Sequence, residues 1–220
     1  MKKDERLRAE NFLLSRIAEE DPAFVDRTME AFDLARSTVY NYINRLQDAG
    51  ELERVGGSMP YRIVYKTHRV TVDTSKEHSE DRIYRREIEP LFSGLPENLR
   101  KIWRYAVTAM MNNAFEHSGA SVVVCVVSQS RLSTIVGVLD NGVGIFRKIQ
   151  ADERARTGEL ISPDEAAAKL YAGGYTDDSE RHAGQGIFFT SRLMDHFVIR
   201  SDLQSFSLDD ESKESEERFR

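Results

Sequence analysis

Residues 99–141 read LRKIWRYAVTAMMNNAFEHSGASVVVCVVSQSRLSTIVGVLDN, and this stretch decides the fold of the chain. Its first half carries apolar residues at helical spacing, which predicts a helix packed on a core: Leu99, Ile102, Trp103, Ala106, Val107, Met110, Met111 and Ala114. Positions 109, 113 and 117 share another face of this helix, one turn apart. Asn113 and His117 therefore place polar groups where a ligand can be met.

Two β-branched, apolar runs follow this helix, at residues 122–127 and 134–139. They predict two buried strands, joined as a hairpin through residues 129–131. The second strand leads straight into the glycine-rich turn DNGVG at 140–144. The carboxylate of Asp140, at a strand end, can accept a hydrogen bond from the exocyclic amine of adenine, and glycines let the backbone approach a ligand closely. The amide oxygen of Asn113 is a ligand that Mg²⁺ takes.

These motifs resemble the GHKL ATP-binding fold, which is shared by gyrase, mismatch-repair ATPases, heat-shock chaperones, histidine kinases and anti-sigma serine kinases. NAFEH at 113–117 resembles its N box, DNGVG at 140–144 its first glycine box and AGQGI at 183–187 its last. The resemblance implies Mg²⁺ and ATP as ligands, with Asn113 holding the metal. The nucleotide-binding residues that it implies are Asn113, His117, Asp140, Gly142, Gly144, Ile145, Gly184, Gln185, Gly186 and Ile187.

Position 109 departs from the family pattern. A glutamate four residues before the asparagine usually acts there as the base that activates water, and here the residue is Ala109. Because alanine cannot accept a proton, we expect this chain to be deficient in ATP hydrolysis. The lineage either binds ATP without efficient hydrolysis, or the chain is an engineered variant that traps nucleotide; we favour the second, since the rest of the N box is intact. Glu116 is a poor substitute, one turn away in the wrong direction.

The N-terminal third predicts three helices and a hairpin. Helices are expected at residues 4–20, ended by the Asp-Pro pair at 21–22, and at about 23–32. Ser37 is expected to cap a third helix whose inner face is Val39, Ile43 and Leu46 and which Gly50 stops. A hairpin should follow, with strands at 52–55 and 61–65 around a glycine turn.

The outer face of the third helix is predicted to bind DNA. It presents Thr38, Asn41, Tyr42 and Arg45 beside Ser37, residue types that meet phosphates and base edges in a major groove. Helices and hairpin together resemble a winged helix-turn-helix over about residues 5–70. Residues 36–70 hold six Lys or Arg against three Asp or Glu, and Arg62 on the hairpin, with Arg54 and Lys66, favours phosphate contact. The alternative is a winged helix used for protein contacts or dimerisation.

The expected fold class is therefore α+β, with two domains. Residues 1–75 form the winged helix, and residues 76–220 form a GHKL-type α/β sandwich, a mixed and mostly antiparallel sheet with helices on one face. Ser162 to Glu165 form a capping box at the start of a helix in the predicted lid, and this helix should end near residues 173–174. Arg181 and His182, later in that lid, can approach phosphates.

The end of the chain is acidic, with seven acids against three bases from Asp202 onward. We expect an exposed hairpin or disorder there, and a sandwich that lacks its last strand. Some related winged-helix ATPases carry a further small domain beyond this point, so a C-terminal domain or a protein partner is expected.

Composition adds limits on the class of protein. The chain has 220 residues, 40% of them hydrophobic, and a formal net charge of −6. Its single cysteine, Cys125, lies in an apolar run, which predicts a buried thiol and no disulfide framework. No apolar run approaches about 18 residues and no signal peptide is present, so the expected location is the cytoplasm, with no membrane partner.

The preferred functional interpretation is an ATP-responsive regulator that binds double-stranded DNA as a homodimer. As in many members of the resembled family, nucleotide would order the lid and change how two chains pair, which would move the winged helices on DNA. One alternative is a protein kinase of the anti-sigma serine or histidine-kinase type, although no phosphoacceptor histidine helix precedes the N box. Another is a DNA clamp or remodelling ATPase in repair or defence.

Overall fold

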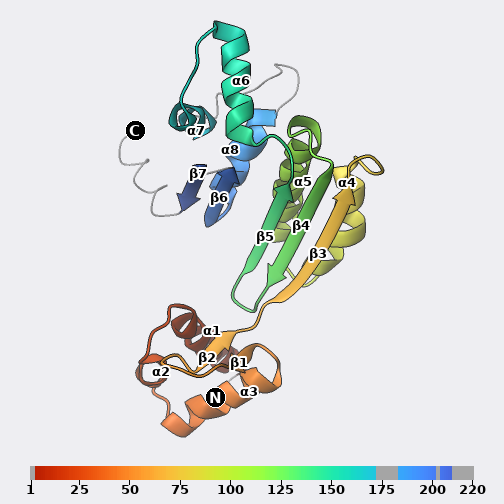
Figure 1. Ribbon diagram of the computed structural model, residues 1–220. Coiled ribbons are helices and arrows are strands. Elements are labelled where there is room, and N and C mark those ends of the chain that lie inside the picture. The colour runs from red at the N-terminus through yellow and green to blue at the C-terminus, as the bar shows by residue number, and fades with distance from the viewer. Residues whose placement is uncertain (1–2, 172–182, 202–203, 210–220) are drawn as a thin grey trace. The chain divides into compact units, whose positions relative to one another are not determined.

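The computed structural model describes residues 3–171, 183–201 and 204–209, and its helices and antiparallel strands confirm the expected α+β class (Figure 1). The chain divides into two compact units. The first comprises Met1–His68 with Val126–Val136, and the second comprises Arg69–Cys125 with Gly137–Arg220.

Three helices open the first unit: α1 (Lys3–Ala18), α2 (Phe24–Phe32) and α3 (Arg36–Asp48). Their bounds agree closely with the predicted ranges, because each helix carries one apolar face. These faces meet in one core, to which the following hairpin also contributes: Ala9, Leu13, Leu14, Ile17, Phe24, Val25, Val39, Tyr42, Ile43, Leu46, Leu52 and Ile63. Removing this apolar surface from water is what holds the three helices together.

The hairpin consists of β1 (Leu52–Arg54) and β2 (Tyr61–Ile63), which pair antiparallel. Its loop contains Gly56 and Gly57, whose φ angles are 76° and 93°. Glycine adopts such angles without the clash that a Cβ atom would cause, so these two residues explain why the chain turns here.

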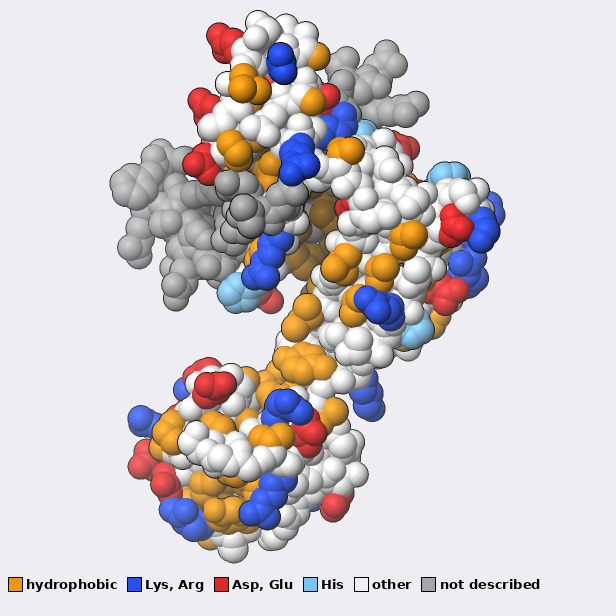
Figure 2. Space-filling view, in the orientation of Figure 1, with side chains coloured by type: hydrophobic (Ala, Val, Ile, Leu, Met, Phe, Trp, Pro, Cys, Tyr) orange, Lys and Arg blue, Asp and Glu red, His pale blue; other side chains and the backbone are white. Residues whose placement is uncertain are grey.

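Three strands form a sheet in the order β3 (Lys66–Asp73), β4 (Val122–Gln129) and β5 (Thr134–Asp140). Alternate residues of β4 are buried, Cys125 among them, as predicted, and burial raises the pKa of its thiol to about 12. The prediction that residues 134–139 are a buried strand is wrong in part. Ile135 and Leu139 are 55% and 54% exposed, because β5 is an edge strand with only one covered face. Hydrophobic side chains are visible over this sheet in Figure 2.

Helices cover one face of this sheet (Figure 1). A continuous helical segment runs through α4 (Glu80–Ile83), the π-helical η1 (Tyr84–Ile88) and the 3-10 helical η2 (Glu89–Phe92). α5 (Glu97–His117) contains the whole apolar repeat that predicted a helix, and it buries Ala106, Val107, Met111 and Ala114. Leu99, expected on the same apolar face, is 39% exposed, since it lies in the first turn of the helix.

The remaining elements are α6 (Ile145–Thr157), α7 (Pro163–Tyr171), α8 (Ala183–Leu193) and the antiparallel hairpin of β6 (His196–Ser201) and β7 (Gln204–Asp209). The capping box at α7 is confirmed: Ser162 N–H donates to Glu165 Oε2 at 2.7 Å, and Glu165 N–H donates to Ser162 Oγ at 3.2 Å. These bonds hold the pKa of Glu165 below its usual value. β7 lies in the acidic tail, where a hairpin was one of two expectations.

Several predictions concern residues outside those described: the end of the lid helix near 173–174, the lid residues Arg181 and His182, and the tail from 210 onward. Within the described ranges, no helix combines the length and apolar character needed to cross a bilayer.

Candidate functional site

Ala109, Asn113 and His117 lie along one face of α5, and all three are partly buried. The side-chain amide nitrogen of Asn113 is buried and makes no hydrogen bond to any residue that the structure describes. A buried donor without an acceptor costs about 1–3 kcal/mol. Asn113 is thus a polar residue in a position that needs an acceptor from elsewhere.

Gly186 of α8 lies directly against Ala109. A Cβ atom placed on Gly186 would come within 3.2 Å of the Ala109 Cβ, which is tighter than an ordinary van der Waals contact. α8 begins at Ala183, so Gly184, Gln185 and Gly186 form its first turn. The N–H groups of a first turn have no partner inside the helix, and such a turn attracts anions.

The turn after β5 contacts Ser118, at the C-terminal end of α5. A Cβ atom on Gly142 would meet the carbonyl oxygen of Ser118 at 2.3 Å, so only glycine fits at this position. Val143 N–H donates to that same carbonyl oxygen at 2.9 Å. Asp140 is exposed, and one of its carboxylate oxygens accepts the Gly142 N–H at 2.8 Å. The turn therefore presents a carboxylate while its backbone is fixed to the C-terminal end of α5.

Asn141 fixes the same turn to the start of β4. Its amide oxygen accepts the N–H groups of Ser121 and Val122, each at 3.0 Å, and its amide nitrogen donates to Ser121 Oγ at 3.0 Å. The sequence analysis gave neither Asn141 nor Ser118 a role. The Asp-Asn-Gly triplet was the available signal for Asn141, because asparagine side chains commonly stabilise turns, whereas no pattern marked Ser118.

Residues from three separate motifs are thus brought together along α5. The arrangement offers a carboxylate for a base amine, an amide for a metal or phosphate oxygen, and the first turn of α8 for phosphate. No carboxylate occupies position 109, and Glu116 is exposed. Among the residues described, no group of three or more His, Cys, Asp or Glu could hold a metal ion by itself.

The predicted DNA-binding face of α3 needs two corrections. Ser37, Asn41 and Arg45 are exposed and Thr38 is partly exposed, but Tyr42 is only 5% exposed and belongs to the core. Position 42 follows Val39 and precedes Leu46 on the apolar face, so it turns inward. Nor does Ser37 cap the helix, because α3 begins at Arg36 with Ala35 in the N-cap position and no side-chain cap.

The hairpin carries the other predicted DNA contact. Arg62 is exposed, and its guanidinium pairs with Glu53 on the neighbouring strand at 2.7 Å. Arg54 and Lys66 are also exposed. Figure 2 shows basic and acidic side chains interspersed on the visible face of this unit, with no single basic patch. Phosphate contact by Arg62 would have to displace Glu53.

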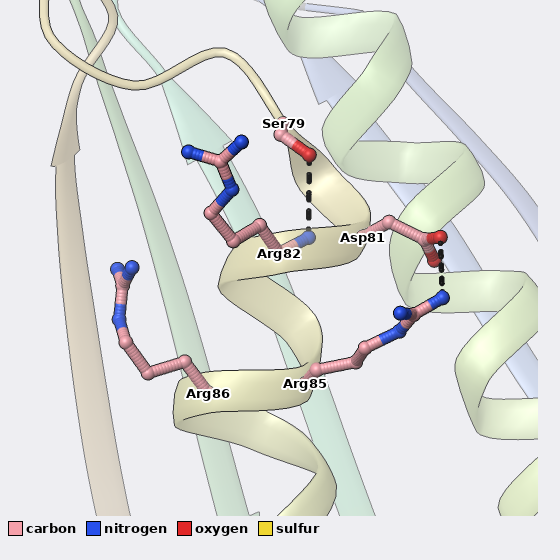
Figure 3. Close-up of a pocket in the computed structure, with 5 residues that line it drawn as sticks. All are labelled: Ser79, Asp81, Arg82, Arg85 and Arg86. Carbon is pink, nitrogen blue, oxygen red and sulfur yellow. Dashed lines mark hydrogen bonds and ion pairs between the residues drawn. The ribbon is translucent and has the colours of Figure 1, made fainter.

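A pocket of about 460 Å³ lies elsewhere, beside α4, and is lined by Ser79, Asp81, Arg82, Arg85 and Arg86 (Figure 3). Its arginines are ion-paired: Arg85 with Asp81 at 3.1 Å, and Arg86 with the neighbouring Glu87 at 2.7 Å. In Figure 3, Arg82 and Arg86 extend to one side of the helix, while Arg85 turns toward Asp81. None of the sequence-predicted site residues lines this pocket.

The sequence analysis also missed Glu10, a buried acid on α1 whose carboxylate lies 3.6 Å from Arg45. A charged residue between the apolar positions 9 and 13 was the signal that could have identified it.

No family model matches the chain, and no curated protein or solved structure matches it either.

Proposed function

We propose that this chain is a Mg·ATP-binding regulator of the winged-helix and GHKL type, which engages double-stranded DNA. In this proposal the first unit contacts DNA, and nucleotide in the second unit controls lid order, pairing of two chains and DNA engagement. The proposal rests on the resemblance of the first unit to a winged helix, on the resemblance of the second to the GHKL fold, and on how the three GHKL-like motifs pack together.

The observation that supports it most is the convergence on α5. Gly186 of the last glycine motif contacts Ala109, and Gly142 of the first contacts Ser118. Between these contacts lies the buried amide nitrogen of Asn113, which has no partner among the described residues. Three motifs that are far apart in the sequence therefore border one polar position. At Gly142 a side chain is excluded, and at Gly186 it would meet a tight contact with Ala109.

Each of these residues would contact a different part of the nucleotide. Asp140 would accept the adenine amine, Asn113 would hold Mg²⁺ through its amide oxygen and donate to a phosphate oxygen, and the first turn of α8 would face phosphate. Bound Mg²⁺ would neutralise phosphate charge. Because Ala109 supplies no base, binding is expected without efficient turnover.

Calorimetry with Mg·ATP and Mg·GTP tests the nucleotide half of the proposal. The unsubstituted chain should bind ATP in preference to GTP, and Asp140→Asn should remove that preference because an amide can donate as well as accept. Asp48→Asn, an exposed acid on α3, is the matched control and should leave it unchanged. Equal ATP affinity in the Asp140→Asn variant would contradict the assignment.

Selection from a pool of random duplexes, with and without Mg·ATP, tests the DNA half. A regulator should enrich one sequence, and its affinity for that sequence should depend on nucleotide. Retention of every duplex alike would point instead to a clamp, and phosphorylation of a protein without DNA retention to a kinase. Enrichment of no sequence would contradict the regulator.

A further inference from the structure

Glu10 is an acidic residue buried within the first unit. It lies on α1 between Ala9 and Leu13, and its side chain is 7% exposed. An ionised carboxylate in such surroundings requires positive charge and hydrogen bonds to compensate for lost hydration. Three arginines, from three different parts of the chain, provide that compensation.

Arg131 provides the closest contacts. It lies in the turn between β4 and β5, within the segment Val126–Val136 that belongs to the first unit. Its guanidinium donates from Nη2 to Glu10 Oε2 at 2.8 Å, from Nε to Asn11 Oδ1 at 2.8 Å and from Nη1 to Glu51 Oε2 at 2.9 Å. The Arg131 side chain is 18% exposed, so its guanidinium group is largely buried. Each of the three guanidinium nitrogens donates to an acceptor.

Arg45 approaches the other oxygen of the same carboxylate. Its Nε lies 3.6 Å from Glu10 Oε1, and Arg6 Nε lies 3.8 Å from that oxygen. Both distances exceed a hydrogen bond, and the Arg45 side chain remains 55% exposed. The charge of Glu10 is also felt by Tyr42 on α3: burial raises the pKa of its hydroxyl, and Glu10 adds to the rise.

We propose that Arg131 is a positioning residue: it orients the Glu10 carboxylate so that the ion pair with Arg45 stays loose, at 3.6 Å, and the half-exposed Arg45 guanidinium can contact a DNA base. This inference rests on the proposed DNA-binding function. The buried carboxylate has one hydrogen-bonded cation, Arg131, and two looser ones. If Arg131 is lost, Arg45 and Arg6 are the remaining cations beside the Glu10 carboxylate, and movement of Arg45 into hydrogen-bond distance would remove its guanidinium from the DNA-binding face.

Two substitutions in the full chain should act in opposite directions. Arg131→Met should weaken binding to the duplex recovered by selection by about ten-fold, as expected when an arginine no longer reads its base. Glu10→Gln should tighten it about two- to five-fold, because the half-exposed Arg45 guanidinium no longer has an ion-pair partner to leave before it contacts DNA. The double variant should lose the defect of Arg131→Met, because no buried charge remains to capture Arg45. Arg100→Met, an exposed arginine on α5, is the control and should have no effect.

A merely structural role predicts something different, since both substitutions would then destabilise the unit and weaken DNA binding together. Equal losses in Arg131→Met and Glu10→Gln, or a double variant worse than either, would overturn the proposal. A loss that is equal for all sequences, rather than confined to the base that Arg45→Ala also affects, would overturn it as well.

A second measurement needs no DNA and so separates failure of this inference from failure of the proposed function. Solvent exchange of the Arg45 Nε–H, followed by NMR on the free chain, should slow in Arg131→Met and quicken in Glu10→Gln. Unchanged exchange in both variants would overturn the inference even if DNA is bound. If the chain selects no duplex but the exchange rates change as expected, the DNA-binding function fails while the control of Arg45 by Arg131 stands.

Discussion

Two clusters of buried polar groups, one in each unit, differ in how far the chain itself satisfies them. Around Glu10, Oε2 of the carboxylate accepts a hydrogen bond from Arg131, while the buried Oε1 has no hydrogen-bond partner in the described part of the chain but lies within 4 Å of the guanidinium groups of Arg45 and Arg6. Around Asn113, the buried amide nitrogen has no hydrogen-bond partner in the described part of the chain, and the nearby contact between helices is Gly186 against Ala109.

The difference separates two uses of buried polar residues. A cluster whose charges are matched within the fold is complete without a ligand and can position its own members. An amide that is buried without a partner carries a cost of about 1–3 kcal/mol, which a ligand can relieve. Glu10 Oε1 also lacks a hydrogen bond, but two arginines face it, whereas no charged partner is recorded for the Asn113 amide nitrogen among the described residues.

The largest effect is expected from adding a carboxylate beside Asn113. Ala109→Glu should raise the rate of ATP hydrolysis by about 10²–10⁴-fold, the usual contribution of a general base, with little change in ATP affinity. Phosphate release at saturating Mg·ATP measures it, and a rate that depends on protein concentration would indicate that dimerisation closes the lid. Ala109→Gln fills the same space without a base and should stay slow. If the unsubstituted chain already matches the glutamate variant, the base lies elsewhere.

Next in size is the cost of a side chain at Gly142. Gly142→Ala should destabilise the fold by about 3 kcal/mol, near the upper end for overpacked sites, because the new Cβ atom would meet Ser118 backbone. Denaturant unfolding measures it, and ATP affinity should fall as well. Gly137→Ala on β5 is the matched control: its Cβ atom would meet only Leu139 Cδ1, at 3.6 Å, so stability should change little. Equal losses in the two variants would remove the argument that Gly142 is fixed by close approach.

Arg45 is the exposed arginine of the cluster around Glu10, so it can be replaced without removing a buried side chain. Arg45→Ala should weaken binding to the selected duplex by about 1–3 kcal/mol and relax the preference at one base pair. Competition with single-base variants of that duplex measures it. Asn44→Ala, an exposed neighbour outside the predicted face, serves as the control. A uniform loss over all sequences would make Arg45 a phosphate contact.

The smallest effect is expected at the hairpin, where Arg62 already has a partner in Glu53. Arg62→Ala should weaken all duplexes alike and reduce the slope of log affinity against log salt by about 1. Arg85→Ala, an arginine on η1 that pairs with Asp81, should leave the slope unchanged. If neither Arg62 nor Arg45 affects binding, the first unit is a protein-interaction module.

Much of the fold could be predicted because it rests on local pattern. The apolar repeat on α5 and the capping box at Ser162 both depend on residues within a few positions of one another. The burial of Tyr42 was also open to prediction, because position 42 lies with Val39 and Leu46 on the apolar face of α3. The exposure of Ile135 was not, because it depends on helices from elsewhere in the chain covering only one face of the sheet (Figure 1).

The candidate site divides in the same way. Motif spacing identified Asn113, Asp140 and Gly186, but it could not show that Gly186 meets Ala109 or that Gly142 meets Ser118. Those contacts arise only when separate elements pack. The Glu10 cluster was missed altogether, since Arg131 and Glu10 are 121 positions apart in sequence.

The contact between Gly186 and Ala109 also constrains the order in which mutations can accumulate. Since a Cβ atom on Gly186 would already come within 3.2 Å of the alanine methyl group, any side chain there would occupy space that a larger residue at position 109 needs. A chain that loses its carboxylate at 109 but keeps Gly186 stays a single substitution from regaining it. A chain that first gains a side chain at 186 does not. Gly186 is therefore the permissive position of this pair, because its missing side chain leaves room for a residue larger than alanine at position 109.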